Sequence, residues 1–270
     1  MQNKSKKKGL KPIYKPYLLG TVFSRKAAGR GWKVGGYLVV LGIISLLVGG
    51  LLSSDSLALR LIVSVVMIVS CGMLLYSEGG RQGEQDVAFA EIAQNRLNEG
   101  RRVPESEKDA CFHPGKGFFT ALVGVLPLFL LALAFSLIAQ KQFYGVGALP
   151  AWVSAYQGEA SIGQALSYYA VEISIRAEDV LRLLMRFLLF PFVNIVGTND
   201  VEGLYLVDKL SPLLCLILPL FYAVGYLRGP YLRALVHGNI RLGRRRHDAR
   251  ERKARQVRAQ RGAEQKKELI

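Results

Sequence analysis

The side chains best placed to do chemistry are four charged residues between positions 178 and 186. Glu178 precedes Arg182 by four residues, and Asp179 precedes it by three, so in a helix both acids can meet the arginine on one face. Arg186 follows one turn later. At membrane depth such ionisable groups are functional candidates by default, and these four residues would then contact an anion or another solute. On an outer surface they would be a solvated stripe worth little, which is the interpretation we favour from sequence.

The densest block of positive charge lies near the C-terminus. Residues 228–270 carry fourteen Lys or Arg residues against four acids. Beside a membrane helix such a block attracts anionic lipid by about 1 kcal/mol per residue near the surface. We therefore expect anionic inner-leaflet lipids to contact Arg241, Arg244, Arg245, Arg246, Arg250, Arg252 and Lys253. Nucleic acid or the ribosome is an alternative partner, which we do not favour because no aromatic residue follows Tyr231 to stack on bases.

Cysteine and histidine patterns predict neither a metal site nor a catalytic centre. Cys111 and His113 are the only close Cys/His pair in the sequence, and a structural zinc site needs a second pair of ligands. Closeness in sequence also does not supply the geometry of a catalytic dyad. The three cysteines form no readable disulfide framework. We therefore expect no catalytic residue, no metal, no cofactor and no enzymatic activity.

The elements that position these residues are set by hydropathy. About 20 apolar residues cross the hydrocarbon core of a bilayer, and four stretches meet that length: 34–52, 57–76, 117–140 and 204–227. The sequence predicts an all-α fold, a polytopic integral membrane bundle of four transmembrane helices. The first two spans form a hairpin, and Arg60 should reach from the second span to the headgroups. Ser211 and Pro212 predict the start of the main fourth helix.

Polar segments flank and connect these spans. Residues 1–33 form a basic arm, and residues 77–116 form a loop in which Asp86 should cap a short amphipathic helix ending at Asn98. Residues 141–203 should be extracytoplasmic and contain an amphipathic helix over 161–196, which begins at a capping box on Ser161. Residues 228–270 form the basic tail. The periodicity of 161–196 places one apolar face towards the bundle or membrane.

Charge bias predicts the orientation of the chain. The first 33 residues hold ten bases and no acid, and the tail is also basic, so both termini should be cytoplasmic in a cell-membrane protein and the number of crossings even. Residues 180–197 are long enough to insert, but Arg182 and Arg186 would each cost about 2.5 to 3.5 kcal/mol at a helix centre. Four crossings are therefore favoured, and six remain the alternative.

No repeat, cofactor motif or transporter motif is present in the sequence. We expect a non-enzymatic accessory or scaffold subunit, anchored in the lipid bilayer by its basic cytoplasmic ends and paired with another membrane protein. The alternative function is a transport or lipid-handling component that uses the charged helix 178–186.

Overall fold

The computed structural model describes residues 12–51, 56–141, 156, 159, 177–197 and 200–268. Within these residues the regular elements are helices, and no strand is present. Four helices are long and apolar enough to cross a membrane: α1 (Arg25–Leu51), α2 (Leu57–Asn98), α4 (Pro114–Ile138) and α9 (Val201–Leu227). The predicted all-α class and the four apolar helices of spanning length are confirmed.

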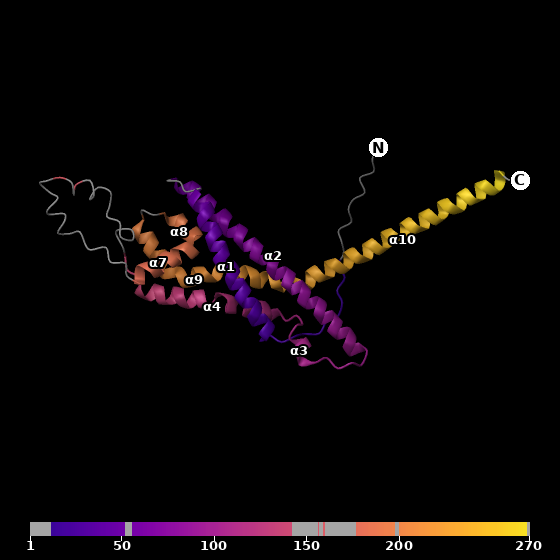
Figure 1. Ribbon diagram of the computed structural model, residues 1–270, viewed down its shortest axis with the longest axis horizontal. Helices are drawn as coiled ribbons and strands as arrows, with labels where there is room; N and C mark the ends of the chain where they lie inside the picture. The colour runs from indigo at the N-terminus through magenta and orange to yellow at the C-terminus, as the bar shows by residue number, and fades with distance from the viewer. Residues whose placement is uncertain are drawn as a thin grey trace.

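The four long helices pack around a shared core. Helix α4 lies along α9, α1 lies on α4, and α2 lies on α9. Figure 1 shows α1 and α2 close together where α1 ends and α2 begins, and well separated at their other ends. Near the close end, Ser45 Oγ lies 3.7 Å from Cys71 Sγ. Buried Val34, Val125 and Tyr222 form part of the core between the helices.

Helix α2 is much longer than the predicted span of 57–76. It runs unbroken for 42 residues, about 60 Å at a rise of about 1.5 Å per residue. The prediction that Asp86 caps a separate short helix is therefore wrong, because Asp86 lies inside α2 and is buried. The predicted polar loop over 77–116 shrinks to the residues between α2 and α4, which include the short helix α3 (Glu105–Lys108).

Close packing explains why glycines do not break α2. A Cβ atom added at Gly79 would meet the backbone oxygen of Tyr222, and one added at Gly83 would meet the backbone oxygen of Tyr226. Glycine inside a helix costs about 0.5–1 kcal/mol relative to alanine, and small residues allow two helix backbones to approach closely. The contact with α9 therefore holds α2 helical through a stretch whose composition suggests a loop.

Helix α9 begins earlier than the sequence indicated. Asp200 caps it by accepting a hydrogen bond from the Gly203 amide at 3.0 Å, so the prediction of a start at Ser211 and Pro212 is wrong. Pro212 cannot donate to the carbonyl oxygen of Asp208 four residues earlier. The Ser211 hydroxyl donates to that oxygen instead, at 2.8 Å. A local side-chain bond thus replaces the missing backbone bond, and the helix continues.

The predicted amphipathic helix over 161–196 is only partly described. The capping box at Ser161 lies outside the described residues, and the remainder forms two helices, α7 (Ala177–Leu188) and α8 (Phe190–Val196). The prediction of one continuous helix is therefore wrong. The helix is interrupted at Leu189, because Pro191 has no amide hydrogen for the backbone hydrogen bonds. Both helices pack against α1, near the end of α1 and the start of α2 (Figure 1). Arg60 donates from Nη1 to the Val196 carbonyl oxygen at 3.4 Å, and its reach to the headgroups stays a prediction.

The basic tail forms a single helix of its own. Helix α10 (Gly229–Glu268) is 40 residues long and follows α9 after Arg228 alone. Its first turns pack on α2, and Figure 1 shows the rest extending beyond every other helix, at the end of the molecule opposite α7 and α8. In the part of the chain that the structure describes, the contacts of α10 are mainly with α2 and, to a smaller extent, with α9.

Candidate functional site

The structure brings the four sequence-predicted charged residues together and adds a fifth, Asp208 of α9. Arg186 of α7 binds Asp208 with two hydrogen bonds, Nη2 to Oδ2 at 2.7 Å and Nε to Oδ1 at 3.1 Å. Such two-point pairing is the strongest geometry between arginine and a carboxylate. Arg182 Nε lies 3.8 Å from Asp208 Oδ2. We call these five residues the Asp208 cluster: Glu178, Asp179, Arg182, Arg186 and Asp208.

The acids of α7 complete this cluster. Glu178 Oε1 lies 2.8 Å from Arg182 Nη2, and Asp179 Oδ1 lies 3.7 Å from Arg182 Nη1, so the predicted one-turn pairs form. The Arg182 side chain is only 1% exposed. A solvated stripe is therefore wrong for Arg182, because its guanidinium is enclosed by these acids and by Phe135, whose ring centroid lies 6.0 Å away.

The Asp208 cluster is nearly balanced in charge. Three carboxylates surround two guanidinium groups, a formal charge of −1. Arg182 Nε and Nη1 nevertheless find no hydrogen-bond acceptor in the part of the chain that the structure describes. The arrangement links α7 to α9 and keeps two buried donors available. Sequence reasoning missed Asp208, although an acid within an apolar span is itself a signal.

A second buried cluster surrounds Asp86, which the sequence had assigned to a helix cap. Arg30 Nη1 donates to both carboxylate oxygens at 2.8 Å. Tyr226 donates its hydroxyl proton to Oδ2 at 2.6 Å, and Lys116 Nζ lies 3.6 Å from the same oxygen. The four residues Arg30, Asp86, Lys116 and Tyr226, which we call the Asp86 cluster, come one each from α1, α2, α4 and α9. This cluster therefore joins all four long helices.

Lys116 also connects the α2–α4 loop to the Asp86 cluster. Its ammonium group donates to the carbonyl oxygens of Asp109 at 2.8 Å and Cys111 at 2.7 Å. Burial raises the pKa of the Cys111 thiol, which lowers the fraction of reactive thiolate. His113 Nδ1 accepts the Gly115 amide at 3.1 Å and caps α4. Cys111 and His113 are therefore close in the sequence, but each makes a separate structural contact, Cys111 with Lys116 and His113 with Gly115.

Further charged contacts hold the first turns of α10 on α2. Glu91 of α2 accepts from Arg233 Nε at 3.0 Å and lies 2.7 Å from His237 Nε2. Arg233 Nη1 also reaches Glu84 at 3.3 Å. His237 had no recognisable partner in the sequence because Glu91 is 146 residues away. These bonds hold only the beginning of α10.

The bases predicted to contact lipid lie beyond these bonds on α10. Exposed side chains belong to Arg241, Arg244, Arg245, Arg250, Arg252 and Lys253, whereas the side chain of Arg246 is outside the described part. Their positions are spread around the whole helix circumference, and no apolar face accompanies them. A helix that is polar all round is suited to solvent and to partners rather than to the membrane interface.

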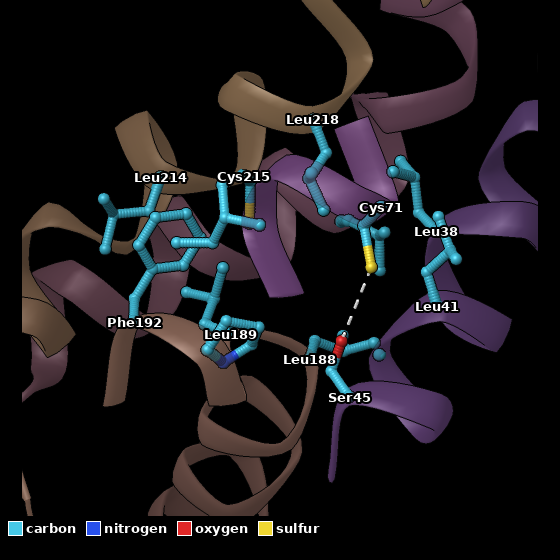
Figure 2. A pocket seen from close by; sticks show the side chains of 14 residues that line it. Leu38, Leu41, Ser45, Cys71, Leu188, Leu189, Phe192, Leu214, Cys215 and Leu218 are labelled. Atoms are coloured by element: carbon cyan, nitrogen blue, oxygen red, sulfur yellow. Dashed lines mark hydrogen bonds between the residues drawn. The ribbon is translucent and has the colours of Figure 1, made fainter. Parts of the chain in front are cut away.

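An apolar pocket of about 530 Å³, including its open mouth, lies between α1, α2, α4, α8 and α9. Figure 2 shows Leu38, Leu41 and Leu218 around it, with Ser45 and Cys71 joined across one side. Among the residues that the structure describes, no charged side chain lines it. It can accept an apolar group, but it supplies no acid, base or activated nucleophile.

Comparison of the chain with protein-family models, with curated protein sequences and with solved structures finds no match in any of the three. We therefore infer the function from the geometry of these helices and clusters.

Proposed function

We propose that the protein is a membrane scaffold subunit, without enzymatic activity, that presents α10 as a basic arm to an anionic partner in the cytoplasm. The observation that carries this proposal is the form of α10, a 40-residue helix that extends beyond the other helices (Figure 1) and exposes its described bases between Arg241 and Arg255. Only its first turns are held by α2. An arm held firmly at one end and open along its length is suited to binding a partner.

Membrane insertion is supported by the apolar surface of the long helices. Large side chains such as Leu47, Ile62, Leu137 and Leu213 are each at least 60% exposed. Water-soluble monomers rarely expose contiguous apolar patches larger than a few hundred Å². In a bilayer the same side chains face lipid tails at no cost.

The proposed topology keeps four crossings of the cell membrane and both termini in the cytoplasm. Helix α7 has 12 residues and α8 has 7, whereas a crossing needs about 20. The break at Leu189 therefore argues against a further crossing by residues 180–197. The basic ends favour the cytoplasmic side by the positive-inside rule, and the Asp208 cluster then lies towards the outer face.

Distance from the bilayer favours a cytoplasmic partner over lipid as the ligand of the arm. At about 1.5 Å per residue, Lys253 lies roughly 36 Å along α10 from Gly229. Charge interactions are screened beyond about 8 Å at physiological salt. Because α10 continues away from α9 (Figure 1), its distal bases are too remote to bind headgroups. An acidic protein surface is the partner we favour, since the arm offers charges without aromatic residues for base stacking.

The test removes charge from the arm and from a matched region. In the full chain in native membranes, R250Q, R252Q, K253Q and R255Q together should reduce crosslinking to the cytoplasmic partner by about tenfold, because charge complementarity governs encounter rates. The control variant K4Q, K6Q, K7Q and K8Q removes the same charge from the N-terminal arm and should leave the capture nearly unchanged. The proposal would be contradicted if both variants crosslinked to the partner as well as the unaltered protein does.

A second candidate function, transport or lipid handling at the Asp208 cluster, is favoured by the two buried nitrogen atoms of Arg182 that have no acceptor within the described residues. A polar solute that entered the protein beside α7 would find hydrogen-bond donors in these atoms. R182Q should then abolish uptake or binding of that solute while leaving arm-dependent crosslinking intact. Unchanged solute handling in well-expressed R182Q protein would exclude this function.

A further inference from the structure

A second, polar pocket lies between α1, α2 and α9. It is about 340 Å³, including its open mouth, and it is lined by charged and aromatic residues. Arg30, Lys33 and Tyr37 come from α1, Glu78 and Arg81 come from α2, and Tyr222 of α9 forms the floor, where it is 1% exposed. Three bases and one acid thus face one hollow.

The bases of this pocket retain donors for a ligand. Arg30 uses only Nη1 to hold Asp86, which leaves Nε and Nη2 without an acceptor in the described part of the chain. Lys33 forms no hydrogen bond or salt bridge with any residue that the structure describes. Arg81 is paired with Glu78, through bonds of 2.9 Å and 2.8 Å, but its side chain is 59% exposed. The lining carries a formal charge of +2.

The pocket lies at the level where the apolar stretches of two helices end. Lys33 immediately precedes the apolar part of α1, and Glu78 closely follows the apolar part of α2. Tyr37 is 42% exposed, and amphipathic aromatic rings of this kind favour the headgroup level of a bilayer. Helices α1 and α2 separate towards these ends (Figure 1), and each carries an exposed apolar side chain one turn from a pocket residue, Val40 on α1 and Leu74 on α2.

We propose that this pocket binds the phosphate group of an anionic phospholipid of the inner leaflet. Arg30 and Arg81 offer the planar fork that matches phosphate oxygens, and Lys33 adds a mobile point charge. One acyl chain lies along the diverging faces of α1 and α2. Basic pockets between spanning helices on the cytoplasmic side are suited to such headgroups. This assignment rests on the membrane insertion proposed above, but not on the proposed role of α10 or on its partner.

Binding is tested on the purified full chain in nanodiscs and by native mass spectrometry. Nanodiscs of phosphatidylglycerol should leave one retained lipid on the protein, whereas phosphatidylcholine nanodiscs should not. K33Q with R81Q should weaken phosphatidylglycerol retention by about tenfold or more, because two phosphate contacts are lost. The control R25Q with K26Q removes the same charge from exposed positions at the start of α1 and should change retention less than about twofold, because neither residue lines the pocket.

A second variant should change phosphatidylglycerol binding in the opposite direction. Its result does not depend on whether K33Q with R81Q folds. E78Q removes the single acid of the lining and frees Arg81, so phosphatidylglycerol should bind more tightly. Weaker or unchanged binding by E78Q would overturn the proposal, as would equal losses in K33Q with R81Q and in R25Q with K26Q. Both results are independent of chain orientation, since the nanodisc has the same lipid in both leaflets.

One more measurement distinguishes a phospholipid from a soluble phosphate ester as the ligand of the pocket. Glycerol 3-phosphate is offered to the protein in neutral detergent without lipid. Tight binding that depends on Lys33 and Arg81, together with no selective retention of phosphatidylglycerol, would assign the pocket to a soluble phosphate ester and overturn the lipid source. Retention of phosphatidylglycerol with only weak binding of glycerol 3-phosphate supports the lipid, because its acyl chain adds apolar burial.

Discussion

Asp86 and Asp208 are both buried between two cations, but their surroundings differ. Asp86 is the only acid in its cluster, and its partners come from three other helices. Asp208 pairs with Arg186 and shares Arg182 with Glu178 and Asp179, which lie on the same helix as the arginines. The first cluster has one negative charge that holds four helices together. The second has three acids for two bases, so Arg182 keeps two carboxylates beside it when Asp208 is lost.

The difference between the clusters explains their separate roles. Removing one partner of a buried ion pair leaves the other charge uncompensated, which costs about 3–5 kcal/mol. Around Asp86 no second carboxylate is available among the described neighbours, so this cluster is a structural junction. Around Asp208, Glu178 and Asp179 still compensate Arg182 after such a loss, so the cost is smaller. The Asp208 cluster is therefore better suited than the Asp86 cluster to binding and releasing a ligand.

The largest effect is expected for D86N. The substitution leaves Arg30 and Lys116 without an ion-pair partner among the described residues, so the free energy of unfolding should fall by about 3–5 kcal/mol. Equilibrium unfolding in mixed micelles of mild and denaturing detergent measures this change. D86N protein as stable as the unaltered chain would show that the Asp86 cluster does not hold the helices together.

D208N should have a smaller effect, a loss of about 1–3 kcal/mol in the same unfolding measurement. Glu178 and Asp179 remain beside Arg182, and the asparagine oxygen can still accept a bond from Arg186. A double-mutant cycle with R186Q gives the coupling between the two side chains directly. A loss as large as that of D86N would remove the contrast between the two clusters.

The smallest effect is expected for the exposed pair of Arg96 and Glu107. Their atoms are 2.7 Å apart, but the two side chains are 45% and 41% exposed. E107Q should therefore lower the free energy of unfolding by only about 0.2–1 kcal/mol, and high salt should remove even that difference. A larger, salt-resistant loss would mean that burial is not what separates strong from weak pairs in this protein.

The clusters also differ in how visible they are in the sequence. Glu178, Asp179, Arg182 and Arg186 lie within nine positions, and helix periodicity alone brings them together. Asp86 is 56 residues from Arg30 and 140 from Tyr226, and no local pattern links them. The composition around Asp86 even pointed elsewhere, because Gly79 and Gly83 resemble loop residues until α9 is seen to pack against them.

The sequence by itself determined the all-α class, the four apolar stretches and the basic ends, because hydropathy and charge are sums over neighbouring residues. It also determined the one-turn pairs of α7. Only the tertiary structure decided that α2 continues past Gly83, that Asp86 joins four helices, that Asp208 completes the cluster of α7, and that Arg30, Lys33 and Arg81 line one pocket. Each of these depends on contacts between residues far apart in the chain, where close packing and buried charge outweigh local propensity.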